Sequence, residues 1–223
     1  MAGNVLITGA SGLLGRELVS LLFQRGFEVT AQYHSHRPDN LPGDWIIGDL
    51  SSLETTRNFL KRHRVALHRC THFVHGYGPI HLKTLDSLKP ADFMRDYHGN
   101  VAAFHAVSAA LIRWGCLESA VAMGFADAGK VRPYRLILTH AVAKNALLLL
   151  VLSLARENPR IRFNMVSPST LRGARFAAPD EKPLEVDRTA RVVADALIGM
   201  ASGTHVVVTP EHPLGEIVYA IPS

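Results

Sequence analysis

A glycine-rich turn near the start of the chain has the residue types and spacing needed to hold a phosphate group. Residues 8–15 read TGASGLLG and join an apolar run, residues 5–7, to a helical pattern. Gly9 permits a tight turn, Gly12 lets the backbone approach a pyrophosphate, and Gly15 lets the helix lie close to the sheet. The free N–H groups and the positive end of that helix then face the phosphates.

The context of this turn supports the same interpretation. It follows a strand pattern and opens a helix, as dinucleotide-binding turns do. We therefore predict that it binds a dinucleotide, and a tight turn without a ligand is the alternative. The predicted contacts are Gly9, Ser11, Gly12, Leu13, Leu14 and Gly15.

The end of the second predicted strand favours a cofactor that carries a 2′-phosphate. NAD sites usually place Asp or Glu here to hold the ribose hydroxyls, but residues 31–37 read AQYHSHR and contain no acid. Arg37, with His34 or its neighbours, suits a 2′-phosphate, so we predict NADPH as the cofactor. A solvent-exposed polar loop is the alternative. After the third predicted strand, Asp49 is well placed to contact the adenine, with Leu50 beside it.

Short apolar runs alternate with helical stretches along almost the whole chain, and they define the elements that must position these residues. Predicted strands cover residues 5–7, 27–32, 45–47, 71–75, 117–123, 161–166 and 204–208, the last of which closes the pattern; predicted helices cover 13–25, 53–64, 91–114, 135–157 and 188–200. Such alternation predicts a single-domain α/β fold over residues 1–223, with a doubly wound, Rossmann-like parallel sheet. Residues 167–187 predict a lid-like substrate loop.

The composition excludes several classes of protein. With 48% hydrophobic and 19% charged residues, the chain is not disordered. The net charge of +5 comes from scattered residues, so we expect an anionic small molecule and no nucleic acid as partner. Two cysteines, no visible signal peptide and a longest apolar run of residues 146–152 predict a cytoplasmic protein without a membrane span. The histidines show no metal-ligand spacing, so no metal site is expected.

Taken together, the motifs resemble the short-chain dehydrogenase/reductase family over essentially the whole chain. Residues 8–15 are similar to its glycine motif, 48–50 to its adenine-side acid, Asn100 to its helix asparagine, HAVAK at 140–144 to its Tyr-x-x-x-Lys helix, and 161–168 to its sixth strand and proline turn. The resemblance implies further cofactor contacts at Gly76, Lys144, Pro168 and Thr170.

Two departures from the family pattern point to a narrower resemblance. The family's tyrosine is replaced by His140, and its serine, thirteen residues earlier, falls on Asp127. An aspartate at that position is a feature of pteridine reductases, whose second-strand segment also reads much like Tyr33-His34 followed by Arg37. The resemblance thus implies an NADPH-dependent oxidoreductase acting on a small pterin-like or carbonyl substrate. The glycine motif also suggests a sugar-nucleotide reductase, but the extra C-terminal domain expected of one is missing.

His140 and Lys144 lie four residues apart, so one helical face carries both. The Lys144 cation would lower the pKa of His140, and Asp127 would oppose this if it lies beside the imidazole. An Asp127–His140–Lys144 proton relay, with Asn100 holding a water or the helix geometry, would work best at mildly acidic to neutral pH. In one alternative Asp127 protonates the substrate and His140 only positions it; in another, the chain is a non-catalytic NADP-binding regulatory protein.

The remaining predictions concern the substrate and the assembly. Tyr77 follows the fourth predicted strand and is expected to contact substrate, and Arg172 in the predicted lid suits an anionic group. The helix at 135–157 is apolar almost all round near residues 147–152. In the family, this helix and the long one before it form a contact between subunits, so the resemblance implies a homodimer or homotetramer.

Overall fold

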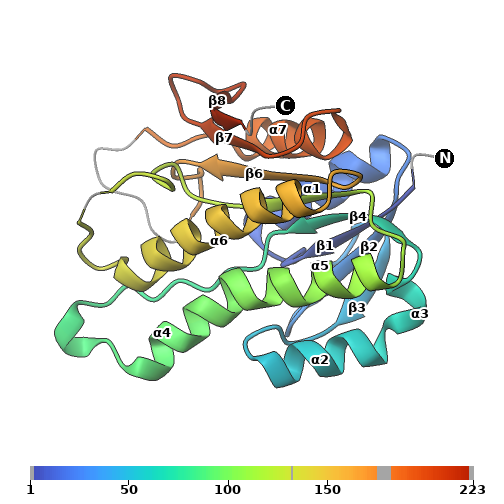
Figure 1. Cartoon of the computed structure of the whole chain (residues 1–223), viewed down its shortest axis with the longest axis horizontal. Coiled ribbons are helices and arrows are strands. Elements are labelled where there is room, and N and C mark those ends of the chain that lie inside the picture. Colours follow the sequence, from blue (N-terminus) through green and yellow to red (C-terminus); the bar gives the residue numbers. More distant parts are fainter. Residues whose placement is uncertain (1–2, 132, 175–181, 221–223) are drawn as a thin grey trace.

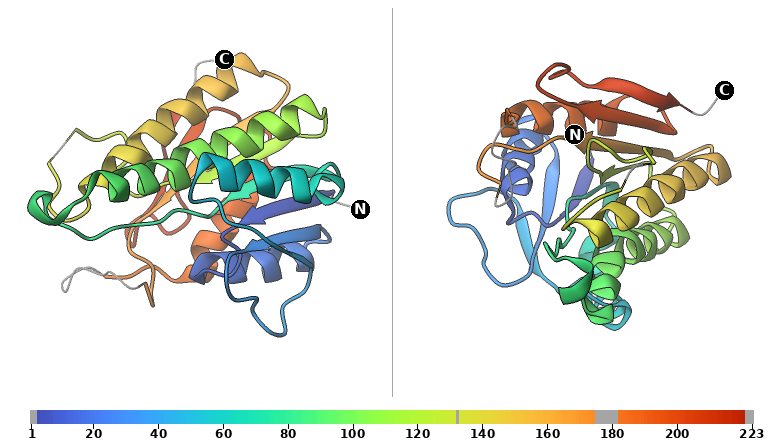
Figure 2. Two further views of the ribbon diagram at one scale, coloured as in Figure 1. Left: turned by 90° about the horizontal axis from the view of Figure 1, so that it is seen from below. Right: turned by 90° about the vertical axis from the view of Figure 1, so that its left-hand side faces the viewer.

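A computed structural model describes residues 3–131, 133–174 and 182–220. Within these residues the chain forms one eight-stranded sheet in the order β3-β2-β1-β4-β5-β6-β7-β8. Helices cover both faces of it, which makes three layers (Figures 1 and 2). The strands are β1 (Asn4–Thr8), β2 (Glu28–Tyr33), β3 (Asp44–Ile47), β4 (Cys70–His75), β5 (Ser119–Met123), β6 (Arg162–Pro168), β7 (Thr204–Val208) and β8 (Glu216–Ala220).

One face of the sheet is covered by α1 (Leu13–Gln24) and α7 (Val186–Ile198), which pack against each other. The opposite face carries the other helices, which run side by side in Figure 2. They are α2 (Leu53–Arg62), α4 (Pro90–Tyr97), α5 (Ala103–Arg113) and α6 (Leu138–Glu157), with the short α3 (Arg64–Leu67) and η1 (Leu85–Ser87) in connecting segments. The predicted α/β fold with a doubly wound sheet is confirmed.

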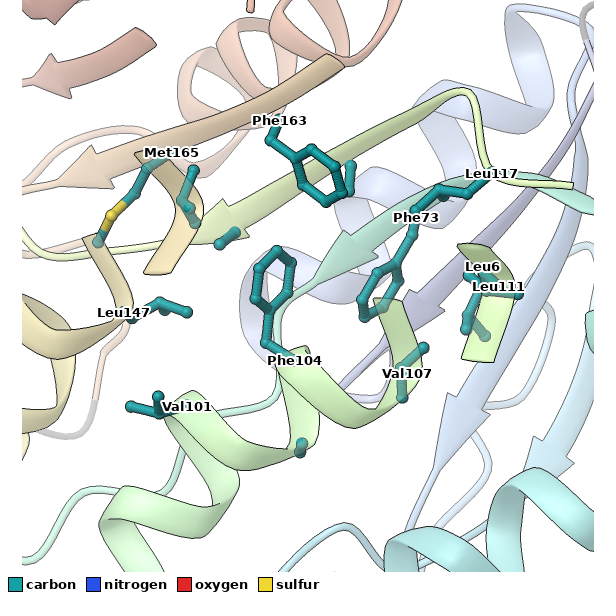
Figure 3. Close-up of a cluster of buried hydrophobic side chains, with 14 of the residues drawn as sticks. Leu6, Phe73, Val101, Phe104, Val107, Leu111, Leu117, Leu147, Phe163 and Met165 are labelled. Carbon is teal, nitrogen blue, oxygen red and sulfur yellow. The ribbon is translucent and has the colours of Figure 1, made fainter. Parts of the chain in front are cut away.

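The core between the sheet and the helices on the α5 and α6 side is built on three aromatic rings (Figure 3). Phe73 of β4 stacks on Phe104 of α5 with ring centroids 5.7 Å apart, and Phe104 meets the edge of Phe163 of β6 at 6.5 Å. All three side chains are fully buried. Because each ring comes from a different element, this contact holds α5 at a defined height over the strands that carry the site.

Two predicted elements need correction. The helix predicted at 91–114 is interrupted by η2 (His98–Ala102), a π-helical turn that contains Asn100. The prediction that 204–208 is the last strand was wrong, because β8 follows and pairs antiparallel with β7. Every residue of β8 is exposed, so it lacks the buried alternation by which strands are recognised in a sequence.

Helix α6 is, among the described residues, the one helix long and apolar enough to cross a membrane, by length and composition only. Its inner face packs on β6 and α4, with Leu147 and Val151 fully buried. The same face buries the charged residue Lys144. These contacts are those of a core helix.

Candidate functional site

The site lies where the chain leaves β1 and β4 at the same edge of the sheet. These neighbouring strands are followed by helices on opposite faces, which opens a crevice at their carboxyl ends. The loops after them touch: a Cβ on Gly9 would stand 2.7 Å from the Tyr77 backbone nitrogen. Gly9 also has a φ of +67°, in the region that favours glycine, so this turn needs glycine on two grounds.

The glycine-rich turn brings the first turn of α1 directly against β1. A Cβ on Gly15 would overlap the Gly9 carbonyl oxygen and lie 2.7 Å from Ala10 Cα. Gly12, at the N-cap, is exposed and has no side-chain capping bond, so the first N–H groups of α1 have no acceptor within the helix. This arrangement fits the pyrophosphate of a dinucleotide, which such N–H groups bind.

A cavity of about 250 Å³ lies in front of this turn. Its walls bring together residues from the loops after β1, β2 and β4, namely Gly9, Ser11, Gly12, Gln32, His34, Gly76, Tyr77, Gly78 and Pro79. Sequence reasoning missed Gln32 of β2, which is buried and joins the segments that follow β1 and β3. Its Oε1 accepts from Gly9 N–H at 2.8 Å, and its Nε2 donates to the Gly48 carbonyl at 2.7 Å.

The two residues predicted to hold a 2′-phosphate lie in different hollows. His34 lines the cavity at the glycine turn, whereas Arg37 lines an adjoining hollow of about 710 Å³ over the outer side of α1. That hollow also contains Leu13 and Arg16. Arg16, which sequence reasoning missed, donates from Nε to the Ser11 carbonyl at 2.8 Å and so adds a cation beside the turn.

Asp49 lines a third cavity, of about 340 Å³, at the end of β3. Its carboxylate accepts from the Ser51 N–H at 2.8 Å and from the Ser51 hydroxyl at 2.9 Å, which holds the side chain in place. The side chain of Leu50 is instead fully buried in the core. Asp49 is therefore the member of this pair whose side chain faces open space.

On the other side of the crevice, Lys144 is buried and donates from Nζ to the Met123 carbonyl at 2.5 Å. Burial lowers the pKa of its ammonium group to about 7, because a charge is poorly solvated there. A Cβ on Gly78 would overlap Asn100 Oδ1 and lie 3.2 Å from Lys144 Nζ. Asn100 and Lys144 thus converge on the bare backbone of Gly78, from η2 and α6.

Asn100 is fully buried, and the nitrogen of its side-chain amide is hydrogen-bonded. Its Nδ2 donates to the Asp96 carbonyl at 2.8 Å and to the Pro79 carbonyl at 3.1 Å. Its Oδ1, in contrast, is buried without a hydrogen-bond partner in the described part of the chain. Such an acceptor is costly to bury unpaired, and it is available to a ligand or a water.

His140 is half-buried beside Lys144, with the edge of its ring against Phe125 at 5.8 Å between centroids. Its Nδ1 is buried and, within the ranges that the structure describes, has no hydrogen-bond partner. Burial, followed by the Lys144 charge, lowers its pKa to about 3, against a smaller opposing effect of the Pro79 carbonyl. The imidazole is therefore neutral at pH 7.

Asp127 forms an ion pair with Lys130 Nζ at 3.1 Å, in the loop after β5. The influence that raises the His140 pKa comes from the Pro79 carbonyl, which contacts the imidazole from the loop after β4. The structure thus gathers His140, Lys144 and Asn100 around Pro79 and Gly78, while the carboxylate of Asp127 is engaged with a cation of its own loop.

His75, at the end of β4, is fully buried beneath the same residues. Its Nδ1 is 2.9 Å from the Thr8 hydroxyl and its Nε2 is 2.9 Å from the Gly99 carbonyl, so it links β1, β4 and η2. Burial and the Lys144 charge lower its pKa to about 3. Sequence reasoning gave it no role, because its burial and partners depend on distant segments.

The remaining residues predicted to contact substrate or cofactor lie in the loop after β4, at the end of β6 or beyond it. Tyr77 lines the cavity at the glycine turn, and burial raises the pKa of its phenol to about 12. Pro168 ends β6, and the Thr170 carbonyl accepts from Leu184 N–H at 2.8 Å across the base of the predicted lid. Arg172 is exposed and pairs with Glu185 at 2.7 Å. Of the predicted lid, residues 175–181 lie outside the described residues.

Comparison of the sequence with family models gives one match that covers most of the chain. Residues 5–209 match the model of the NAD dependent epimerase/dehydratase family. A curated protein from Synechocystis sp., named "Putative dihydroflavonol 4-reductase", is 44% identical over 55 residues. That segment covers 23% of this chain and only 16% of the Synechocystis protein.

Solved structures of similar fold cover nearly the whole chain. A short chain dehydrogenase from Burkholderia cenocepacia J2315, in complex with NADP, has a TM-score of 0.80 at 22% identity, covering 94% of this chain and 97% of its own. The 4-hydroxyisoleucine dehydrogenase complexed with NADH has a TM-score of 0.82 at 16% identity, covering 93% and 97%. The landomycin C-6 ketoreductase LanV, with bound NADP and rabelomycin, gives 0.80 at 17%, covering 95% and 96%. At these identities the likeness is one of fold.

Proposed function

The chain belongs to the NAD dependent epimerase/dehydratase family, and on that premise we propose that it is an NADPH-dependent reductase of the short-chain dehydrogenase/reductase type. The observation that carries this proposal is the pairing of a glycine turn that fits a pyrophosphate with a buried lysine across the same crevice. When bound, the dinucleotide supplies the hydride. The remaining tasks, which are orientation and proton transfer, fall to the chain.

The choice of NADPH over NADH rests on charge at the end of β2. Between Ala31 and Arg37 no carboxylate is present to hold the ribose hydroxyls of NAD. His34 lines the cavity at the glycine turn, and Arg37 and Arg16 add cations in the adjoining hollow. We propose that this group holds the 2′-phosphate, while Asp49 contacts the adenine.

For the proton, we propose the relay of Asp127, His140 and Lys144, with Lys144 as its charged member at neutral pH. Lys144, with a pKa of about 7, is protonated in half or more of the molecules below that pH. His140, with a pKa of about 3, is neutral and passes a proton without holding a charge. Asp127, which pairs with Lys130 at 3.1 Å, is the third member of the proposed relay.

The substrate we propose is a small carbonyl or pterin-like compound. Two buried polar atoms in this part of the molecule, Asn100 Oδ1 and His140 Nδ1, have no hydrogen-bond partner in the described chain. Asn100 Oδ1 accepts hydrogen bonds, and a neutral imidazole nitrogen accepts or donates according to tautomer. A flat molecule with N–H and C=O groups, such as a dihydropterin, would satisfy both.

One observation favours a second candidate, a non-catalytic NADP-binding regulatory protein. An imidazole with a pKa of about 3 is a poor proton donor at neutral pH, in the position where the resemblance implies an acid. In this reading the cofactor site is used for sensing, and His140 only fills space beside Phe125.

The deciding experiment joins a binding titration to a turnover screen. Purified protein is titrated with NADPH and NADH by fluorescence, and oxidation of NADPH is then followed with dihydropterins and small aldehydes, ketones and quinones. The reductase predicts tighter NADPH binding and turnover of a substrate that His140→Ala and Lys144→Met both reduce. Binding without turnover on any of these compounds supports the regulatory protein, and no binding of either cofactor rejects both.

We further propose that the protein acts in the cytoplasm as a homodimer or homotetramer. Support comes from exposed apolar side chains, since Leu149 of α6 and Val218 of β8 are 68% and 50% exposed and line the same hollow. A second copy of the chain would cover this apolar surface. Sedimentation velocity tests this: a monomer at micromolar concentration contradicts it.

A further inference from the structure

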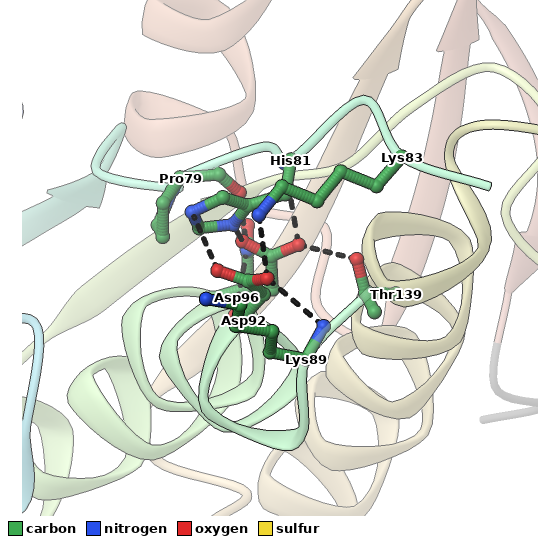
Figure 4. A network of polar contacts seen from close by, with 8 residues as sticks. Pro79, His81, Lys83, Lys89, Asp92, Asp96 and Thr139 are labelled. Atoms are coloured by element: carbon green, nitrogen blue, oxygen red, sulfur yellow. Dashed lines mark hydrogen bonds and ion pairs between the residues drawn. The ribbon is translucent and has the colours of Figure 1, made fainter. Parts of the chain in front are cut away.

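Asp96 is a fully buried carboxylate at the point where three segments of the site meet (Figure 4). Its Oδ1 accepts from His81 Nδ1 at 2.6 Å, and its Oδ2 accepts from the Thr139 hydroxyl at 2.5 Å and from the His81 N–H at 3.4 Å. Its main-chain carbonyl accepts from Asn100 Nδ2 at 2.8 Å. One residue of α4 therefore joins the loop after β4, the π-helical turn and the first turn of α6.

Each of these segments carries a residue of the candidate site. Two residues before His81, the Pro79 carbonyl accepts from Asn100 Nδ2 and opposes the lowering of the His140 pKa. Thr139 directly precedes His140 at the start of α6. The bonds made by Asp96 thus reach His140 from two directions, through its own helix and through the loop that faces its ring.

Stability alone is a weak reason to place a carboxylate there. A buried ion costs several kcal/mol in lost hydration, and well-packed apolar residues often replace buried ion pairs without loss of stability. The value of such a group lies in the directions that its hydrogen bonds impose. For Asp96 these directions set the loop after β4 and the start of α6 relative to each other.

Asp92, one turn earlier in α4, provides a matched contrast. Its Oδ2 accepts from Lys83 Nζ at 2.7 Å and from the Lys89 N–H at 3.0 Å. Its Oδ1 lies 3.8 Å from His81 Nε2. It is buried like Asp96 and anchors the same loop, but its partners in the described chain lie on the loop side alone. Neither Thr139 nor Asn100 is among them.

We propose that Asp96 is a positioning residue that orients the His140 imidazole and the Asn100 amide for the reaction. The inference rests on the proposed function of the site. The Thr139 hydroxyl holds the first turn of α6 against Asp96, which fixes the direction in which His140 leaves the helix. The His81 imidazole holds the loop so that the Pro79 carbonyl faces His140. Asp96 itself contacts neither cofactor nor substrate.

The kinetic test compares Asp96→Asn and Thr139→Val with Asp92→Asn and with the conservative Thr139→Ser. Misplacement of a reacting group by about 1 Å costs about 100-fold in rate, so we expect a loss of that size in kcat for Asp96→Asn and Thr139→Val. The Kd for NADPH should stay within about twofold, since these bonds lie away from the glycine turn. Thr139→Ser and Asp92→Asn should keep most of the wild-type kcat.

A second readout needs no turnover. In protein labelled with ¹⁵N-histidine, the imidazole resonances of His140, assigned with His140→Gln, should shift in Asp96→Asn and Thr139→Val but not in Asp92→Asn. If wild-type protein turns over no substrate, the reductase proposal fails and these resonances still decide the positioning role. Unmoved His140 resonances in both variants, or equal shifts in Asp92→Asn, would overturn it. Should Asp96→Asn not fold, Thr139→Val decides alone.

Discussion

The crevice has a side formed by the glycine turn, here called the cofactor side, and a side formed around Lys144, here called the reaction side. The two sides differ in how their buried polar atoms are hydrogen-bonded. On the cofactor side, Gln32 is buried with both ends of its amide bonded, to Gly9 and to Gly48. On the reaction side, Asn100 Oδ1 and His140 Nδ1 are buried without partners among the described residues, next to the Lys144 cation. A ligand that pairs with them would recover the cost of their burial. The buried amide on the cofactor side thus has its hydrogen bonds within the chain, whereas the two buried atoms on the reaction side would obtain theirs from a ligand.

From this difference we expect the cofactor side to be most sensitive to substitutions that cause overlap with backbone atoms. The reaction side should be most sensitive to substitutions that change a charge. Variants that introduce atoms should damage the first most, whereas variants that remove polar atoms should damage the function of the second and spare its stability.

Gly15→Ala should cause the largest loss. Its Cβ would overlap the Gly9 carbonyl and approach Ala10 Cα, and backbone atoms have little room to yield. We expect a loss of about 3 kcal/mol in the free energy of unfolding, at the upper end for overpacked sites, together with loss of NADPH binding. Urea unfolding and fluorescence titration measure the two effects.

Gly12→Ala is the matched control for that loss. Its Cβ would meet only the Gly9 carbonyl, at 3.2 Å, on the exposed side of the turn. NADPH binding should weaken while the unfolding midpoint stays near that of the wild type. If Gly15→Ala unfolds at the same urea concentration as Gly12→Ala, the close approach of α1 to β1 is not what holds the turn.

Lys144→Met should lower turnover about 100-fold, as loss of a preorganised charge does, and should also make the protein more stable. The pKa of this lysine falls from 10.5 when exposed to about 7 in the folded chain, so between these values the unfolded chain binds more protons. The free energy of unfolding of the wild type must therefore rise with pH across that window.

The test for Lys144 is urea unfolding at pH 6.5, 8 and 9.5. Lys144→Met should be more stable than the wild type at pH 6.5, and the gap should narrow as pH rises. Lys130→Met, at an exposed lysine, is the control and should show no such gap. A gap that widens with pH would contradict the burial of a charged Lys144.

The next effect in size is expected from acid, which should lower the free energy of unfolding through His140. In the folded chain His140 has a pKa of about 3 against 6.5 when exposed, so the unfolded chain binds more protons between these values. Stability must fall as pH drops through that range, by at most about 1.4 kcal/mol per pH unit for one histidine. His140→Gln should remove that share of the slope, and His36→Gln, at an exposed histidine, should not. Equal slopes in His140→Gln and wild type would show that the imidazole is not buried as described.

The smallest effects are expected at the 2′-phosphate. His34 lines the cavity at the glycine turn and Arg37 the hollow beside it, so His34→Ala should weaken NADPH binding more, by about tenfold against about twofold, with NADH binding unchanged. Parallel titrations of both variants measure this. A larger loss in Arg37→Ala would place the phosphate over the outer side of α1.

The cofactor side was predictable because its determinants are local. The glycine turn, the strand before it and the helix after it occupy one continuous stretch, residues 4–24, and the structure has these elements within a residue or two of the predicted bounds. Gln32 escaped notice because a buried amide that bridges two distant segments leaves no periodic signal. The antiparallel β8 escaped for a related reason, since an exposed edge strand lacks a buried face.

The sequence predicted which residues form the reaction side, but it did not predict their contacts or their charge. Lys144 and Asn100 were identified from spacing and resemblance, and the structure brings both to Gly78. The effect of Asp127 on His140 was left open in the sequence, because it depends on whether two loops meet. Here Asp127 pairs with Lys130, and the Pro79 carbonyl contacts the imidazole of His140. From the sequence, Asp96 (Figure 4) was recognisable only as part of the helix predicted at residues 91–114.

By itself the sequence determined the alternation of strands and helices as far as β7, the doubly wound sheet and the glycine-rich turn, because periodicity and glycine spacing act over a few residues. Only the tertiary structure decided the charge states of His140 and Lys144, the partners of Asp96 and the separation of His34 from Arg37. These depend on burial and on contacts between segments far apart in the chain. The pKa of a side chain depends on its surroundings, and the residue type alone does not specify those surroundings.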